Sequence, residues 1–193
     1  MEKTKKPCIN PPNPRKDIET FQPYSAPLEG RRNLLRLDFN ENTIGPSPLV
    51  IQSLREISRE EISIYPEYSG LKEKVVETLI KQNSKVNISS SEVGIYNGVD
   101  AALNAFFHAY GEFNDVMLTT SPTFGYYTSC AQMRGMKINS IPHEGENFQY
   151  PFEKICEFIT KYNPKIILIC NPNNPTGTRL NPQRIMEMTK LSS

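Results

Sequence analysis

The chain has 193 residues, a formal net charge of +1 and a hydrophobic content of 37%, which suits a globular protein with one sizeable core. Its near-neutral charge balance gives no electrostatic reason to bind nucleic acid or an anionic membrane. The apolar runs are too short to cross a bilayer and residues 1–14 are too polar for a signal peptide, so we expect a cytoplasmic protein. Four widely spaced cysteines and only two histidines predict reduced thiols and no metal site.

Prolines interrupt residues 1–30 so often that no long regular element is expected there. The sequence then predicts a short strand at residues 34–39 and a polar, turn-rich loop at residues 40–46. Ser47 and Pro48 provide an N-cap and a first-position proline, so they are expected to begin a helix.

Apolar side chains recur at helical spacing in residues 71–82, which predicts a second amphipathic helix. From residue 93 onward, predicted strands and helices alternate, which is typical of a mostly parallel sheet with helices on both faces. The expected strands are residues 93–96, 115–119, 137–141 and 165–170. The expected helices are a segment that follows residues 97–100 and ends near residue 110, a segment ending near residue 134, residues 151–162 and a segment beginning at Pro182.

The most informative segment is the turn NPNNPTG at residues 171–177, which directly follows the apolar run at residues 165–170. Two X-Pro bonds, a pair of asparagines and a closing glycine predict an abrupt turn at the carboxyl end of that strand. Ligands of open α/β sheets bind at this end, because helix N-termini and loop amides converge there. A strand-to-helix turn made of ordinary turn residues is the alternative interpretation.

This heptapeptide resembles the signature of fold-type I, pyridoxal-phosphate-dependent aminotransferases, most closely that of histidinol-phosphate aminotransferases. The resemblance implies the α/β fold of the fold-type I large domain, and it implies that Asn174 hydrogen-bonds the phenolic oxygen of pyridoxal 5'-phosphate. An amide suits this contact because it donates a hydrogen bond without carrying a charge. The resemblance also suggests cis peptide bonds at Asn174-Pro175 and Ser121-Pro122.

Two further motifs resemble cofactor contacts of the same family. Gly98, Val99 and Asp100 match its phosphate-binding turn, in which the glycine permits close approach and amides at the helix start donate. In this match Asp100 caps the helix or contributes its own amide, while Ala101 stands where the family often has glutamate. Phe124 matches the aromatic residue that stacks on the pyridine ring; an aromatic residue of a core helix is the alternative.

Other matches lie in the N-terminal half of the chain. Tyr65 is expected to reach the cofactor phosphate of a neighbouring subunit, which implies a homodimer; an aromatic residue that closes a core edge is the alternative. Tyr24, Asn40 and Asn42 match segments on the substrate side of the family. For Tyr24 the alternative is an aromatic residue that anchors the N-terminal arm by packing.

The resemblance covers residues 18–190 and implies three parts. Residues 1–33 are expected to form an N-terminal arm, residues 34–90 the first part of the small domain, and residues 91–193 an incomplete cofactor-binding large domain.

The activity implied by the resemblance is amino-group transfer between histidinol phosphate, or a similar amine, and 2-oxoglutarate. No lysine of the chain matches the family's Schiff-base position, and the acid that protonates the pyridine nitrogen has no counterpart either. We therefore assign no catalytic residue and expect the chain alone to be inactive. Two alternatives remain: a pyridoxal-phosphate-dependent lyase similar to threonine-phosphate decarboxylase, and a non-catalytic fragment that pairs with a full-length homologue.

Overall fold

The computed structural model describes residues 12–19, 21 and 29–191. The chain forms two compact units, one made of residues 1–24 with 96–193 and the other of residues 25–95, and each is described by itself. Tyr24 lies outside the described residues. Within the described ranges, no helix combines the length and the apolar character needed to cross a bilayer.

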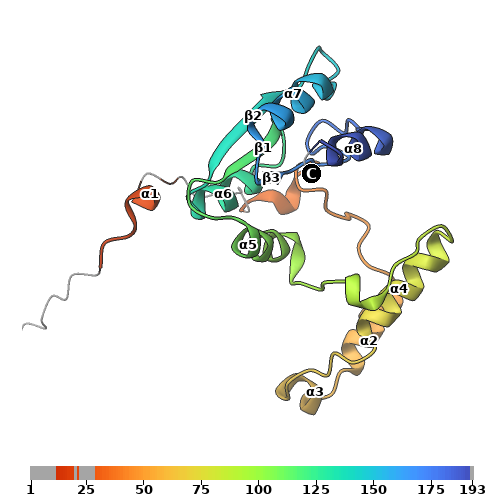
Figure 1. Ribbon diagram of the computed structural model, residues 1–193. Coiled ribbons are helices and arrows are strands. Elements are labelled where there is room, and N and C mark those ends of the chain that lie inside the picture. Colours follow the sequence, from red (N-terminus) through yellow and green to blue (C-terminus); the bar gives the residue numbers. More distant parts are fainter. Residues whose placement is uncertain (1–11, 20, 22–28, 192–193) are drawn as a thin grey trace, which may run out of the picture. The chain divides into compact units, whose positions relative to one another are not determined.

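The unit that contains residues 96–193 is built on a parallel sheet of three strands in the order β2-β1-β3. The central strand is β1 (Val116–Ser121), and β2 (Lys137–Pro142) pairs with it along its whole length. Figure 1 shows these strands side by side with helices around them. The expected strands at residues 115–119 and 137–141 are confirmed to within about two residues, as is usual for element boundaries.

The third strand, β3 (Ile166–Ile167), is shorter than the expected strand at residues 165–170. It pairs with β1 through these two residues, and the Leu168 N–H still donates to the Leu118 carbonyl at 2.9 Å. Beyond Leu168 the backbone leaves the sheet for the proline-containing turn. The apolar run therefore overestimated the length of the hydrogen-bonded strand. It also overestimated its burial, since Ile166 is buried and residues 167–170 are only partly buried.

Four helices of at least eight residues accompany this sheet, and all four were expected. They are α5 (Gly98–Tyr110), α6 (Tyr126–Met133), α7 (Phe152–Tyr162) and α8 (Pro182–Thr189). A short helix, α1 (Lys16–Glu19), contacts α6, and Arg15 donates to the Met133 carbonyl at 2.5 Å.

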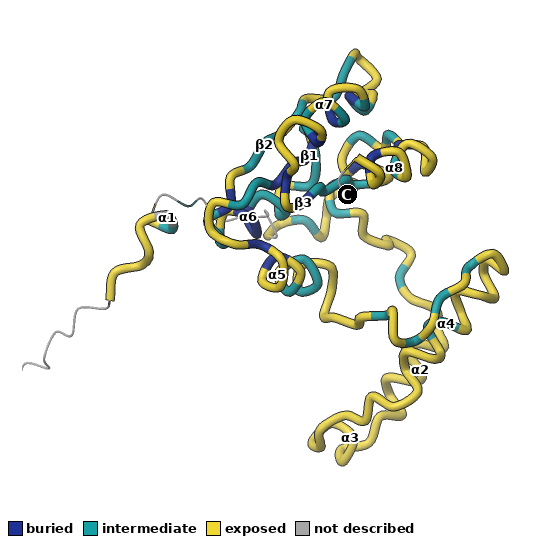
Figure 2. The backbone as a smooth tube through the Cα atoms, viewed as in Figure 1, coloured by how far each residue is buried: buried dark blue, intermediate teal, exposed yellow. Residues whose placement is uncertain are grey.

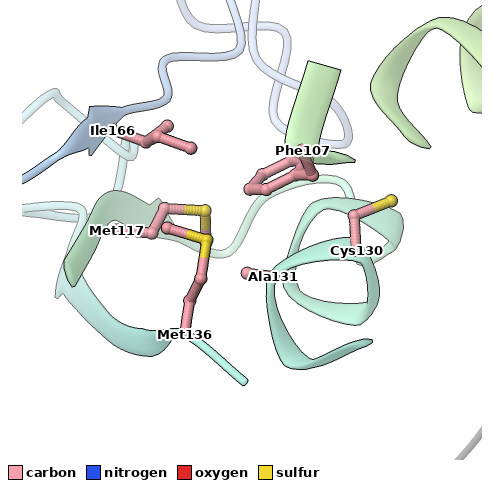
Figure 3. Packing of buried hydrophobic residues seen from close by; sticks show 6 residues of the cluster. All are labelled: Phe107, Met117, Cys130, Ala131, Met136 and Ile166. Atoms are coloured by element: carbon pink, nitrogen blue, oxygen red, sulfur yellow. The ribbon is translucent and has the colours of Figure 1, made fainter. Parts of the chain in front are cut away.

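Side chains of β1 alternate between two apolar clusters on opposite faces of the sheet. Met117 belongs to the cluster formed with α5 and α6, whose buried members are seen in Figure 3. Leu118 belongs to the cluster formed with α7 and α8. The expected arrangement, a parallel sheet with helices on both faces, is confirmed. The two clusters are made of Phe107, Met117, Cys130, Ala131, Met136 and Ile166 on one face and Leu118, Ile155, Ile159, Leu180 and Met188 on the other.

Two expected strands are absent from the structure. Residues 93–96 and 34–39 are irregular and pair with no other strand. A strand requires a partner edge, and neither segment pairs with the outer edge of β2 or of β3. The apolar character of these segments therefore did not lead to strand formation, and both predictions are wrong.

The unit of residues 25–95 is helical. It contains η1 (Arg31–Asn33), α2 (Pro48–Glu56), α3 (Arg59–Ser63), α4 (Leu71–Gln82) and η2 (Ser90–Glu92). The helices expected after Ser47 and at residues 71–82 are confirmed, and the Ser47 hydroxyl accepts from the Leu49 N–H as predicted. Helix α3 was missed, although Ser58 and Glu61 form a capping box that is visible in the sequence.

No described side chain of residues 29–95 is buried, as Figure 2 shows. Large apolar side chains such as Leu49, Leu54 and Ile62 remain exposed on α2 and α3. This unit therefore has no core of its own among the described residues.

Candidate functional site

Three segments of the larger unit carry the predicted cofactor contacts. They are the loop after β1, which carries Phe124, the turn at residues 171–177 after β3, and the first turn of α5. Side-chain hydrogen bonds join the first two segments, because Asn173 contacts both Pro122 and Thr123. Burial raises the pKa of Tyr126 at the start of α6, and the charge of Asp100 in the first turn of α5 is a smaller cause.

The turn at residues 171–177 is held by an internal network of hydrogen bonds. The Asn171 side chain pairs with both backbone groups of Leu180, accepting from its N–H at 3.0 Å and donating to its carbonyl at 2.9 Å. Asn173 is 3% exposed, and its backbone N–H and carbonyl bond Thr178 and Gly177. Such a network predicts a rigid turn, since the side chains of Asn171 and Asn173 are both hydrogen-bonded within it.

Three peptide bonds near this edge are cis: Ser121-Pro122, Asn171-Pro172 and Asn174-Pro175. The first and the third were expected from the resemblance and are confirmed. The bond at Asn171-Pro172 was not anticipated.

Asn174 is exposed, as Asn171 is, whereas Asn173 is buried. The backbone N–H of Asn174 donates to the Cys170 thiol at 3.4 Å, whereas its side chain has no hydrogen-bond partner among the described residues. A side-chain amide held on a rigid turn and free to donate suits a ligand oxygen. The cofactor contact of Asn174 remains a prediction.

Phe124 lies in the loop between β1 and α6 and is half-buried. Its ring meets the Tyr127 ring edge to face, with centroids 5.3 Å apart and an interplanar angle of 82°. Because α6 begins at Tyr126, Phe124 is not part of the helix, which contradicts the alternative of a core-helix aromatic residue. Its position before the helix suits an apolar surface for a ligand ring.

The first turn of α5 presents backbone N–H groups that no side chain caps. The N-cap residue is Asn97, whose side chain makes no cap hydrogen bond, and the Gly98 N–H bonds the Tyr96 carbonyl at 2.9 Å. An α-helix leaves its first N–H groups without intrahelical partners, so the amides of Val99 and Asp100 can bind an anion. Gly98 has a φ of +81°, and no atom lies within 4 Å of where a Cβ would stand.

Asp100 does not cap α5. It is the third residue of the helix, so the prediction that its carboxylate acts as the N-cap is wrong. The reason is that the helix begins two residues earlier, at Gly98, whose positive φ provides the entry into the helix. The second expected role of Asp100, through its own amide, remains a prediction.

Aromatic and polar side chains support the turn from the α7 side of the sheet. The Tyr150 hydroxyl donates to the Cys170 carbonyl, directly before the turn. His143, which follows β2, bonds the Phe148 carbonyl at 2.8 Å and the Thr120 hydroxyl at 3.0 Å. A carbonyl can only accept, so Nδ1 of this histidine carries the proton and Nε2 accepts from Thr120 in the neutral ring.

Burial raises the pKa of both tyrosines that contact Cys170. The pKa of Tyr150 rises to about 12, with burial as the larger cause and the charge of Cys170 as the smaller. Burial, followed by a hydrogen bond with the Cys170 side chain, raises the pKa of Tyr127 well above its usual range. The neutral hydroxyl of each is therefore the form that the fold stabilises.

We expect this to appear as alkaline destabilisation. A pKa raised by folding contributes stability that is complete below the unfolded value of 10.0 and is lost as the pH rises through the folded value of about 12. The thermal unfolding midpoint should therefore fall between these pH values, and phenolate absorbance should show a late phase that is reduced in Tyr150→Phe. Ionisation of all tyrosines in one phase near pH 10.0 would contradict this assignment.

Three other predicted site residues belong to the unit of residues 25–95. Tyr65 is 96% exposed, in the loop between α3 and α4. Asn42 closes a local turn, donating to the Gly45 carbonyl at 2.8 Å and accepting from the Ile44 N–H at 3.1 Å. Asn40 has a φ of +54°, a backbone conformation that asparagine tolerates. Hydrogen bonds thus join the two segments that carry Phe124 and Asn174. Gly98, Val99 and Asp100 form the first turn of α5 in the same unit.

Sequence reasoning missed Asn173, the buried residue at the centre of the turn. Its type and position in the heptapeptide were visible, but nothing local distinguishes a buried asparagine from an exposed neighbour. Among the described residues, no group of histidine, cysteine and acidic side chains could hold a metal ion.

Comparison with known proteins adds to this geometry. Residues 32–193 match the family model of aminotransferase class I and II. Over 167 residues the chain is 32% identical to a histidinol-phosphate aminotransferase from Clostridium novyi, which covers 84% of the chain and 44% of that relative. It is 31% identical to a dihydroxyacetone phosphate transaminase from Campylobacter jejuni, with 90% of the chain and 47% of the relative covered.

Among solved structures, the fold is similar to that of histidinol-phosphate aminotransferase from Sinorhizobium meliloti in complex with pyridoxal-5'-phosphate. The TM-score is 0.66 at 16% sequence identity, and the match covers 81% of this chain and 40% of that one. The chain spans about half the length of the curated relatives it matches.

Proposed function

Because the chain belongs to the class I and II aminotransferase family, we propose that it contributes the cofactor-binding edge of a pyridoxal-phosphate-dependent transaminase. The observation that carries the proposal is the state of Asn174. It is exposed, its side chain has no described partner, and it stands on a turn whose other asparagines are fully engaged.

The residues at this edge fit pyridoxal 5'-phosphate in three ways. The amides of Val99 and Asp100, beside a Gly98 that has no side chain, suit the phosphate. The half-buried ring of Phe124 suits the face of the pyridine, and the Asn174 amide suits the phenolic oxygen. When bound, the cofactor supplies an electron sink for chemistry at the carbon that bears the amino group.

We propose that the substrates are histidinol phosphate, or a similar phosphate-bearing amine, and 2-oxoglutarate. Support comes from the names of two relatives at 31–32% identity, a histidinol-phosphate aminotransferase and a dihydroxyacetone phosphate transaminase. Tyr24, Asn40 and Asn42 are the residues proposed for the substrate side. A lyase of the same family is the alternative.

We propose that no lysine of the described residues supplies the amine that this chemistry needs. The three segments of the site contain no lysine. Lys137 and Lys165 stand at the amino ends of β2 and β3, and Lys154 is paired with Glu144 at 2.7 Å. That carboxylate raises the pKa of Lys154 and keeps it protonated, which does not suit a nucleophile. We therefore propose that the 193-residue chain alone does not transaminate, and that a non-catalytic chain pairing with a longer homologue is the second candidate function.

We also propose a homodimer in which Tyr65 reaches the cofactor phosphate of the second copy. Its 96% exposure and the absence of buried side chains from residues 29–95 support an unfilled contact surface in this unit. The three described cysteines are free thiols, which supports a reducing, cytoplasmic location.

Equilibrium dialysis of the 193-residue chain against pyridoxal phosphate and against pyridoxal tests the proposal. We expect the phosphate form to bind about tenfold more tightly or better, since charge-assisted hydrogen bonds are worth about 1.5–3 kcal/mol. A parallel assay with histidinol phosphate and 2-oxoglutarate should form no glutamate above the rate of free pyridoxal phosphate. Equal affinities for the two ligands would show that α5 does not bind the phosphate. Glutamate formation would overturn the proposal that the chain alone is inactive.

A further inference from the structure

We propose that Asn173 is a positioning residue that fastens the loop carrying Phe124 to the turn carrying Asn174. We call these segments the aromatic loop (residues 121–125) and the signature turn (residues 171–177). The fastening itself is independent of any ligand. Its consequence is a fixed spacing between Phe124, proposed to contact the pyridine ring, and Asn174, proposed to contact the phenolic oxygen. This consequence rests on the proposed function.

The side chain of Asn173 bonds both segments at once. Its Oδ1 accepts from the Thr123 hydroxyl at 2.9 Å, and its Nδ2 donates to the Pro122 carbonyl at 2.9 Å and to the Thr176 hydroxyl at 2.8 Å. The first two partners precede Phe124 in the aromatic loop, 50 and 51 residues away in sequence. The third lies in the signature turn, two residues beyond Asn174.

Because position 173 is buried, only a side chain that both accepts and donates as asparagine does can satisfy its hydrogen-bond partners. Asn173 is 3% exposed, so water cannot replace a lost partner, and an unpaired buried group is costly. Aspartate has nearly the same shape and can still accept from Thr123. It cannot donate, however, so it would turn a carboxylate oxygen toward the Pro122 carbonyl and repel it. We therefore expect Asn173→Asp to separate the two segments.

Asn171 provides a matched control within the same turn. Its carboxamide also makes two hydrogen bonds, but both go to the backbone of Leu180. These hydrogen bonds join the start of the signature turn to Leu180, three residues beyond its end, and do not reach the aromatic loop. Asn171→Asp removes one donor and adds one charge, as Asn173→Asp does, without touching the contact between the segments.

The chain contains no tryptophan, so Phe124→Trp introduces a unique fluorophore into the aromatic loop. In this single-tryptophan chain we would measure the emission maximum and the quenching by acrylamide, without cofactor. Adding Asn173→Asp should shift the emission to longer wavelength and increase quenching, because loop opening rises about tenfold or more when a buried hydrogen bond is lost. Adding Asn171→Asp should leave both values unchanged.

A second pair of variants keeps the test decisive if Asn173→Asp does not fold. Thr123→Val removes the hydroxyl that donates to Asn173 and keeps the side-chain shape, whereas Thr123→Ser keeps the hydroxyl. We expect the valine variant to shift the emission as Asn173→Asp does, and the serine variant to behave like the single-tryptophan chain. Far-ultraviolet circular dichroism would establish that each variant retains its helices.

Two outcomes would overturn the proposal. In the first, Asn173→Asp and Thr123→Val both leave emission and quenching unchanged in folded chains. In the second, Asn171→Asp shifts emission and quenching as much as Asn173→Asp does, which indicates general loosening of the turn. Pyridoxal phosphate is then added as a separate probe. Absence of tryptophan quenching by pyridoxal phosphate in every chain would count against the proposed function and not against the fastening. Quenching that weakens in Asn173→Asp and not in Asn171→Asp would support both.

Discussion

Replacing Asn174 by aspartate is expected to lower the affinity for pyridoxal phosphate by about a hundredfold or more. A hydrogen bond to a charged oxygen is worth about 1.5–3 kcal/mol, which corresponds to roughly a 10- to 150-fold change in affinity. The aspartate carboxylate adds repulsion of the phenolic oxygen where the amide provided a donor. Folding should be unaffected, because the side chain is exposed and its bond to the Cys170 thiol uses the backbone N–H.

Equilibrium dialysis measures this change, with circular dichroism as the check on folding. Asn163→Asp is the matched control, since it adds the same charge to an exposed asparagine at the opposite edge of the sheet, before β3. Its positive φ of 42° is tolerated by aspartate as well as by asparagine. Equal affinities of Asn174→Asp and the unchanged chain would remove Asn174 from the cofactor site.

Phe107→Ala is expected to destabilise the larger unit by about 3–5 kcal/mol, the usual cost of deleting a fully buried aromatic side chain. Phe107 is 0% exposed and, as Figure 3 shows, lies among Met117, Met136 and Ile166 of the cluster under α5 and α6. Removing the ring also removes the packing that anchors α5. Since the free energy of unfolding of whole domains is only about 5–15 kcal/mol, this single change removes a large part of it.

The adjacent residue offers the control. Phe106 is 41% exposed, although its ring centroid lies only 5.7 Å from that of Phe107. Phe106→Ala should therefore cost about 1 kcal/mol, as expected for a largely solvated aromatic residue. Urea unfolding monitored by circular dichroism compares the two variants, and similar midpoints for both would show that the α5 face carries no core.

Local signals were sufficient for most helices and for two strands. Ser47 before Pro48 predicted the start of α2, and Asn181 before Pro182 predicted that of α8, because a cap and a first-position proline act within one helical turn. Helix α3 carried an equally local signal in Ser58 and Glu61 that was not used. The family and the parallel sheet also followed from the sequence, through the heptapeptide and the alternation after residue 93.

Strand formation at residues 93–96 and 34–39 was predicted wrongly for a physical reason. A strand is completed by hydrogen bonds to another segment, and those partners are not encoded in its own apolar pattern. The same reason explains why β3 is confined to Ile166–Ile167. The helical role given to Asp100 failed because the start of α5 depends on the backbone at Gly98, two residues earlier.

The sequence by itself determined that an asparagine-rich turn follows an apolar segment that enters the sheet, and that Asn174 and Phe124 are candidate ligand contacts. Only the tertiary structure decided which asparagine faces solvent and which holds the site together. Asn173 and Asn174 are adjacent and chemically identical, yet one is 3% exposed and bonds a loop 50 residues away, while the other is exposed with an unpartnered side chain. Burial and hydrogen bonding between distant segments arise only when β1 and β3 pair, because that pairing brings the loops at their carboxyl ends together.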